Sequence, residues 1–122
     1  MCFSENELTA IVRMAKAMAA ADGKIDAKEL ILIAGELASF ASGIDGSRIL
    51  DSSDNMSADE ALRILNRLTP EEKKYVCGYL AAISTADGNV DDKEIAVWKL
   101  VSTLANFPTM TFQQALSFWR NN

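Results

Sequence analysis

The sequence contains no histidine, and this absence removes a large group of functions. Histidine is the usual general base of enzymes and a frequent ligand of zinc and iron. Catalytic triads that activate a serine or cysteine through histidine are therefore excluded. Any metal site in this chain must be built from oxygen ligands.

Cysteine, proline and long apolar runs are also scarce. The two cysteines, Cys2 and Cys77, are far apart and lack the spacing of a zinc site, so we expect a reduced intracellular chain. Two prolines and an apolar content of 49% argue against a disordered or loop-rich chain. The sequence starts without the pattern of a secretory signal, and no apolar stretch reaches the ~18–20 residues of a membrane span. We expect a cytoplasmic protein without direct membrane insertion.

Basic residues are the minority among the charged ones. Twelve lysines and arginines stand against seventeen acidic residues, which gives a net charge of −5 and no basic run. Binding to nucleic acid depends on clustered cations, so we expect no nucleic-acid partner. The length of 122 residues predicts a single domain over 1–122 with its own hydrophobic core.

What the sequence does contain is a ten-residue stretch that occurs twice. The stretch Ala-Asp-Gly-Lys-Ile-Asp-Ala-Lys-Glu-Leu (21–30) returns as Ala-Asp-Gly-Asn-Val-Asp-Asp-Lys-Glu-Ile (86–95) at an offset of 65 residues. Helical apolar spacing surrounds both copies, so each copy is the turn between two helices. We expect two related helix-turn-helix halves, about 3–41 and 68–106, with a connector over 42–67.

Capping residues and apolar periodicity predict helices along the whole chain, and no strand pattern appears. The fold class is therefore all-α, with a short C-terminal helix after the two halves. We expect only one helical turn in the polar connector, around Arg48 to Ser52. The apolar C-terminal helix is either a lid on the core or a surface for a partner. Helix starts are predicted after Ser4, Asp26, Ser57, Thr69, Asp91 and Thr111.

The repeated acidic turns resemble the second half of a calcium-binding EF-hand loop. That loop places oxygen ligands at positions 5, 9 and 12 around a glycine at position 6. Aligning Gly23 and Gly88 with the glycine gives two matching sets of candidate metal ligands. They are Asp22, Asp26 and Glu29 in the first copy, and Asp87, Asp91 and Glu94 in the second.

The first half of the EF-hand loop is missing from both copies. Its positions 1 and 3 fall on Met18 and Ala20, and on Ile83 and Thr85, within the preceding helices. Calcium takes six to eight oxygen ligands, and one copy supplies about four. A self-contained EF-hand is therefore excluded, whereas a site shared between Asp22 and Asp87 stays open.

A purely structural role explains most of the same acids. Asp26 and Asp91 can cap the helices that follow them, and the glutamate three residues later can complete each capping box. The aspartate before each glycine can close an Asx-turn through its own side chain. Both the capping role and the cation role remain open from the sequence.

The chain resembles the TerB-like family. The resemblance depends on the duplicated Ala-Asp-Gly-x-[Ile/Val]-Asp-x-Lys-Glu and on Met-Ser-Ala-Asp-Glu-Ala-Leu followed by Leu-Thr-Pro-Glu-Glu-Lys, and it covers nearly the whole chain. This family includes the tellurite-resistance protein TerB and the N-terminal domain of DjlA-type membrane co-chaperones. The resemblance implies an all-helical bacterial domain with acidic turns as candidate metal ligands. It also implies association with protein partners in stress-response complexes, often near membranes.

Two classes of function follow as hypotheses. The first is a non-enzymatic TerB-like adaptor with no catalytic residues, whose only cofactor is a divalent cation such as calcium, magnesium or manganese. The alternative is a metal-dependent hydrolase that uses Asp22 and Asp87 as ligands. The sequence does not show the positioned base, the nucleophile or the arginine pair for phosphate that a hydrolase would need. We therefore expect the adaptor.

Overall fold

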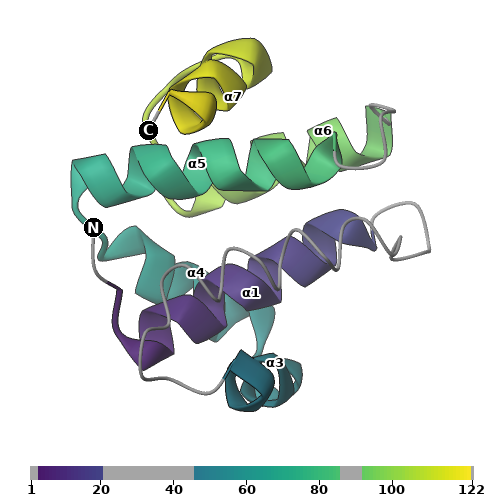
Figure 1. Ribbon diagram of the computed structural model, residues 1–122, viewed down its shortest axis with the longest axis vertical. Coiled ribbons are helices and arrows are strands. Elements are labelled where there is room, and N and C mark those ends of the chain that lie inside the picture. Colours follow the sequence, from purple (N-terminus) through teal and green to yellow (C-terminus); the bar gives the residue numbers. More distant parts are fainter. Residues whose placement is uncertain (1–2, 21–45, 86–91, 122) are drawn as a thin grey trace.

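Six helices make up the described part of the chain. The computed structural model describes residues 3–20, 46–85 and 92–121, and it contains no strand in those ranges (Figure 1). The predicted all-α class is confirmed, although the predicted helix over 27–41 lies outside the described residues. None of the described helices is both long and apolar enough to cross a membrane. The helices are α1 (Glu5–Ala19), α3 (Gly46–Asn55), α4 (Ala58–Asn66), α5 (Pro70–Ser84), α6 (Asp92–Leu104) and α7 (Phe112–Arg120).

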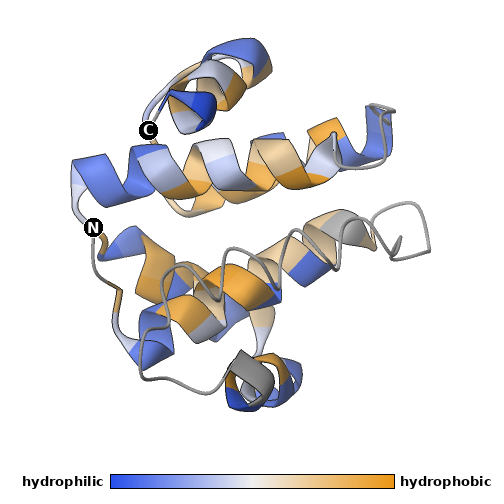
Figure 2. Ribbon diagram, viewed as in Figure 1, coloured by the Kyte–Doolittle hydropathy of each residue, from blue (hydrophilic) through white to orange (hydrophobic). Residues whose placement is uncertain are grey.

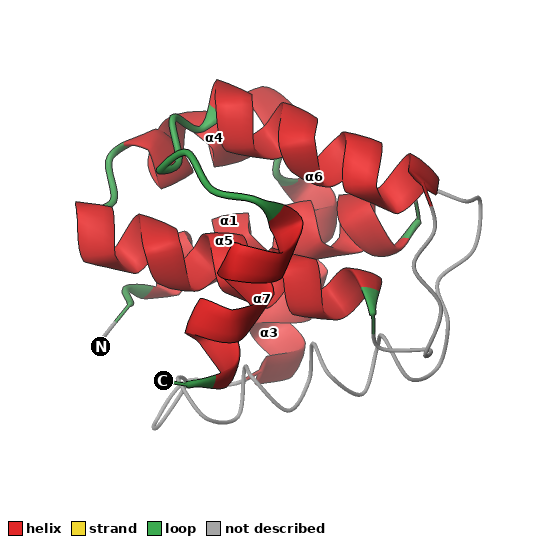
Figure 3. Cartoon of the chain, turned by 90° about the horizontal axis from the view of Figure 1, so that it is seen from above, coloured by secondary structure: helices red, strands yellow, loops and turns green. Residues whose placement is uncertain are grey.

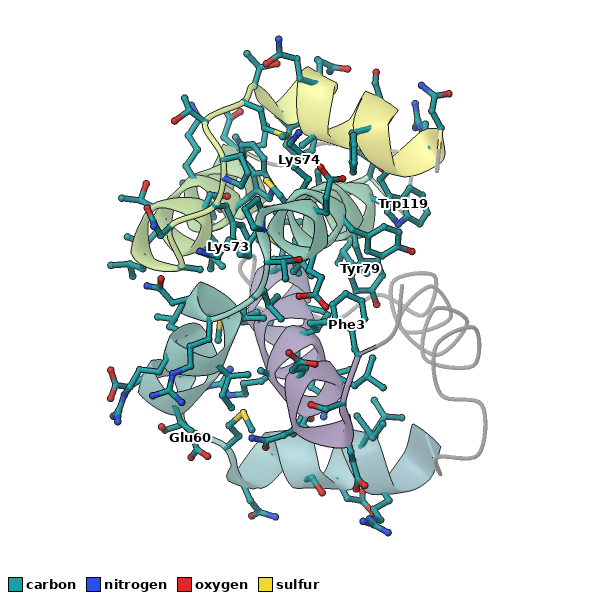
Figure 4. All side chains as sticks on the ribbon, turned by 90° about the vertical axis from the view of Figure 1, so that its left-hand side faces the viewer. Phe3, Glu60, Lys73, Lys74, Tyr79 and Trp119 are labelled. Carbon is teal, nitrogen blue, oxygen red and sulfur yellow. The ribbon has the colours of Figure 1, made fainter. Side chains whose placement is uncertain are left out.

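The helices form two stacked groups around a central pair. α1 and α5 lie against each other at the centre, with α3 on the outer side of α1 and α7 on the outer side of α5 (Figure 1). α4 lies beside α1 and α6 beside α5, both on the same side of the molecule (Figure 4). Apolar residues are concentrated where α1, α4 and α5 face one another (Figure 2). Each central helix therefore contributes to one shared core.

The central helices show the duplication directly. α1 and α5 each have 15 residues, and their bounds keep the offset of 65 positions. Ser4 and Thr69 cap the two N-termini, and Glu7 and Glu72 reach back to complete a capping box in each. A cap of this kind satisfies backbone N–H groups that the helix leaves unpaired, and it contributes about 1 kcal/mol. The repeat therefore includes the helix before each acidic turn.

The other predicted helix starts in the described ranges are also confirmed. α4 follows Ser57, whose hydroxyl accepts a hydrogen bond from the Glu60 N–H. α7 follows Thr111, which forms a full capping box with Gln114. Proline stands at the first position of α5, where its missing N–H has no helical partner to lose. A helix cap depends only on residues that are close together in the sequence, so these helix starts could be predicted from the sequence.

The connector is more helical than its composition predicts. Instead of one turn, α3 runs for ten residues. Its serines, aspartates and glycine are weak helix formers, so the helix depends on packing. Ile49 and Ser53 are completely buried, and α3 packs on α1. Tertiary contact therefore overrides the local preference of this segment.

Two long cationic side chains of α1 hold α3 in place. Lys16 Nζ donates to the carbonyl of Leu50 at 2.9 Å and to the carboxylate of Asp54 at 2.9 Å. Arg13 Nε donates to the carbonyl of Met56 at 3.0 Å, just beyond the end of α3. Because these bonds reach backbone carbonyls, they fix the position of the helix itself.

α7 occupies the same place in the second half, but it is held differently. It begins 66 residues after α3 begins, and Gly78 of α5 corresponds to Arg13 of α1. A Cβ atom at Gly78 would lie 2.6 Å from the Ala115 carbonyl oxygen and 2.6 Å from the Trp119 Cβ. α7 therefore packs directly on the backbone of α5, and the structural repeat extends past the predicted halves to α3 and α7.

α7 is a lid on the core, one of the two alternatives that the sequence left open. Ala115 and Leu116 are buried against α5, while Phe112 and Trp119 are half-buried. The Phe112 ring meets Trp98 of α6 edge-on, with centroids 5.4 Å apart. Phe112 and Trp119 thus pack against the core.

α6 ends at Leu104, before Phe107 and Pro108. Asn106 adopts a left-handed conformation with φ of 59°. Its N–H donates to the Thr103 carbonyl at 3.2 Å, and the Phe107 N–H donates to the Ser102 carbonyl at 2.8 Å. These two bonds form a Schellman motif, which satisfies the last carbonyls of a helix. Asparagine takes the place that glycine more often occupies.

Candidate functional site

The helices that lead into the acidic turns end at the same pole of the molecule. α1 and α5 lie side by side and run in the same general direction (Figures 1 and 3). Their C-caps are Ala20 and Thr85, and Asp22 and Asp87 each follow two residues later. The described ends of the two helices that precede the acidic turns therefore share one pole.

The C-termini of α1 and α5 contribute negative partial charge at this pole, and the N-terminus of α6, which follows the second turn, contributes a positive one. Each helix C-terminus carries about half a negative elementary charge from its aligned peptide dipoles. α5 has no basic residue in its last turn. α1 has Lys16 there, but its ammonium group is bound to α3, 2.9 Å from the Asp54 carboxylate. A cation at this pole would therefore meet little opposing charge from α1 or α5.

Glu94 is the predicted ligand that falls within the described residues. It lies in the first turn of α6, and only 1% of its surface is exposed. Helix N-terminal N–H groups stabilise a carboxylate at this position, and a buried carboxylate requires such compensation. The burial fits the capping role, and it equally fits a carboxylate held against a cation. The other candidates, Asp22, Asp26, Glu29, Asp87 and Asp91, lie outside the described residues.

The structure explains why neither turn forms a complete EF-hand. α1 extends to Ala19 and α5 to Ser84, so the first loop positions lie inside helices. Met18 and Ile83, at position 1 of the two loops, are completely buried apolar side chains. The Thr85 hydroxyl, at position 3, donates to the Ala82 carbonyl at 3.0 Å. Within residues 3–20, 46–85 and 92–121, no three acidic or cysteine side chains converge on a metal position.

Cys77 is a buried thiol at the contact between α5 and α6. Its Sγ lies 3.8 Å from the Ser102 Oγ, and its carbonyl accepts a hydrogen bond from Trp98 Nε1 at 3.0 Å. Burial raises the pKa of Cys77 to about 11, and the contact with Ser102 only partly offsets this rise. A nucleophilic cysteine needs a thiolate, so Cys77 is a packing residue.

A polar hollow of about 470 Å³ lies between α1, α3 and α4. Its carboxylates come from Glu5 and Glu60. Glu5 forms an ion pair of 2.7 Å with Arg48, and Glu60 lies on the outer surface of the molecule (Figure 4). The hollow brings together no nucleophile and base, so it supports no catalytic assignment.

The sequence analysis missed a second apolar face on α6. The helical spacing predicts an inward face of Ile95, Trp98, Val101 and Ala105, of which the last three are buried and Ile95 is half-buried. On the adjoining solvent-facing side, Leu100 and Leu104 are 57% and 51% exposed, with half-buried Val97 one turn before Leu100. We call Val97, Leu100 and Leu104 the outer face of α6. Their helical spacing was visible in the sequence and was the signal that could have found them.

Comparison with known proteins gives a family. No protein-family model and no curated protein matches the sequence. A crystal structure of the protein PG1108 from Porphyromonas gingivalis W83 is 42% identical, covering 100% of this chain and 99% of that one, with a TM-score of 0.81. The chain belongs to the PG1108 family. PG1108 is described as a protein of unknown function, so the family likeness carries the fold and no activity.

Proposed function

We propose that this chain is a non-enzymatic, TerB-like adaptor that binds a divalent cation between its two acidic turns. It would act in the cytoplasm within a bacterial stress response of the tellurite-resistance type, through association with a protein partner. A bacterial setting agrees with the similarity to the Porphyromonas gingivalis protein. The TerB-like motifs in the sequence are the basis of the adaptor role.

The observation that carries the cation site is the common direction of α1 and α5. Their C-terminal ends lie at one pole (Figure 1), and Asp22 and Asp87 follow the two C-caps two residues later in the sequence. Each turn offers about four oxygen ligands, whereas calcium takes six to eight. Two turns together meet this requirement. Calcium, magnesium and manganese are the candidate ions because all three accept oxygen ligands.

Thermal unfolding with and without these ions tests the proposal. A cation that binds only the folded chain adds about 2.7 kcal/mol at a hundred times its dissociation constant. For a domain of this size, the melting temperature should rise by roughly 10 °C. We expect Asp22→Asn combined with Asp87→Asn to abolish the rise.

The matched control removes two carboxylates elsewhere. Asp54 and Asp59 form ion pairs on α3 and α4, with Lys16 and Arg63. Asp54→Asn combined with Asp59→Asn makes the same change of charge and should leave the rise intact. An equal rise in both double variants would contradict the shared site. No rise with any of the three ions would contradict cation binding altogether.

A further inference from the structure

The outer face of α6 exposes apolar surface that the core does not need. Among the described residues, the large apolar side chains that are more than half exposed are Leu100 and Leu104. They are one helical turn apart and form a stripe along α6. Single exposed apolar residues are common, but a rimmed stripe on one helix is typical of an interaction surface.

Three cations surround this stripe. Lys99 is exposed on α6 itself. Arg67 follows Asn66, whose side-chain amide donates to the Leu104 carbonyl at 3.5 Å. Lys73 lies on the side of α5 that faces α6 (Figure 4), one turn before Cys77. The ion pairs that Lys16, Arg48, Arg63 and Lys74 form involve none of these three cations.

The nearest acids on α5 do not neutralise these cations. Glu71 pairs with Lys74 at 3.8 Å, and Glu72 accepts a hydrogen bond from the Thr69 N–H at 2.9 Å. The outer face of α6 is therefore a basic, apolar strip on a chain with a net charge of −5. A partner with complementary charge must be acidic at the contact.

The same charges argue against two other occupants. A second copy packed on this face about a twofold axis would bring like cations together, which costs free energy. An anionic membrane would attract three cations but would repel the rest of a chain with a net charge of −5. An acidic protein segment meets the strip without either penalty.

The shape of the surface favours a helix as the bound segment. Val97, Leu100 and Leu104 follow one another along α6 at helical spacing. A helix laid along α6 can place apolar side chains on this stripe, with its acids over the basic rim.

We propose that the outer face of α6 binds an amphipathic helix of a partner protein that carries acidic residues on both sides of an apolar stripe. The inference rests on the adaptor role proposed above, but it does not depend on the cation site. The partner class is defined by the leucine pair Leu100 and Leu104 and by the rim of Lys73, Lys99 and Arg67.

Two synthetic helical peptides with the same leucine stripe test this proposal. One carries glutamates beside the stripe and the other carries lysines. We expect the glutamate peptide to shift the amide NMR signals of residues 97–104 and 66–67 in the full chain. We also expect it to bind at least about tenfold more tightly than the lysine peptide. The titration is run with a chelator, so that failure of the cation site leaves its outcome unchanged.

Variants separate the apolar and the charged contributions. Leu100→Ser combined with Leu104→Ser should abolish binding, and the fold should persist because both side chains are exposed. Lys99→Glu should weaken binding of the glutamate peptide severalfold. Arg120→Glu makes the same change of charge at an exposed residue of α7 and should have no effect.

Several outcomes would overturn the proposal. No binding of the glutamate peptide, or equal binding of both peptides, would show that the strip does not select an acidic helix. Binding to phosphatidylserine vesicles without binding to the peptide would assign the face to a membrane. A dimer in sedimentation experiments that the double leucine variant dissociates would assign it to a second copy. In each case the cation-dependent rise in melting temperature would be unaffected.

Discussion

Cys77 shows how the environment of one residue decides its chemistry. The side chain is completely buried, and the Cys77 backbone carbonyl and thiol both contact α6. In such surroundings the charged thiolate is disfavoured, which raises the pKa of the thiol to about 11. The raised pKa has a consequence for stability at high pH.

We predict that stability falls between about pH 9 and pH 11 because of Cys77. Below pH 9 the thiol is protonated in both the folded and the unfolded chain, so its full contribution is present. Above pH 9 the unfolded thiol loses its proton first, because its ordinary pKa is 9.0 and the folded value is about 11. The free energy of unfolding should drop by about 2–3 kcal/mol across this range.

Urea denaturation of the wild type and of Cys77→Ala at several pH values measures this drop. Lysines and tyrosines also titrate in this range, so the difference between the two proteins is the relevant quantity. The difference should shrink as the pH rises. Parallel pH profiles for the two proteins would show that Cys77 ionises equally easily in both states.

Some residue roles were predictable from the sequence and others were not. The caps at Ser4, Thr69 and Thr111 were predictable because a capping box needs only four consecutive residues. The complete burial of Glu94 was not, because burial depends on elements far away in the sequence. Asn106 was missed because asparagine ends helices less often than glycine does.

α3 and α7 occupy corresponding places in the two halves, but different interactions hold each of them. In the first half, Arg13 and Lys16 hold α3 through hydrogen bonds to backbone carbonyls. In the second half, Gly78 lets α7 approach the backbone of α5 directly. The long side chains of Arg13 and Lys16 join α1 to α3 by hydrogen bonds, whereas Gly78 allows α5 and α7 to pack in direct contact.

Gly78→Ala tests the close packing of α7. Alanine is the better helix former by about 1 kcal/mol, so an open site would gain stability. At Gly78 the new methyl group would meet Ala115 and Trp119, and overpacking of this kind costs about 1–3 kcal/mol. We expect a net loss of about 1–2 kcal/mol in the free energy of unfolding by urea.

A control for this variant is Ser117→Ala, at an exposed position of α7. It adds helix propensity without a steric conflict and should change the stability by less than about 0.5 kcal/mol. If Gly78→Ala were stabilising, α7 would have to lie farther from α5 than the structure places it.

At the level of elements, the sequence predicted helix positions better than helix packing. α4, α5 and α7 begin where their caps indicated. The length of α3 was underestimated because the burial of Ile49 and the hydrogen bonds from α1, which stabilise this helix, depend on tertiary contacts. The second apolar face of α6 was overlooked because one apolar face already satisfied the helical pattern.

The described part of the molecule places different chemistry on different surfaces. The C-termini of α1 and α5 share one pole, and an acidic stretch follows each of them in the sequence. The outer face of α6 is basic and apolar. A chain built in this way can hold a cation at one place and a partner helix at another, which is the arrangement proposed here for an adaptor.

Only part of this arrangement could be predicted from the sequence. The duplication was visible because the two copies share residues in register. The common direction of α1 and α5 was not, because two related halves can pack with their turns together or apart. The parallel arrangement of α1 and α5, on which the proposed cation site depends, therefore appears only in three dimensions.

The central claim is that the two turns form one cation site. Isothermal titration calorimetry of the full chain, after removal of bound metal, counts the ions directly. The account predicts one calcium, magnesium or manganese ion per chain, and weaker binding in both Asp22→Asn and Asp87→Asn. Two ions per chain, each lost with only one of the aspartates, would show separate sites and contradict the claim.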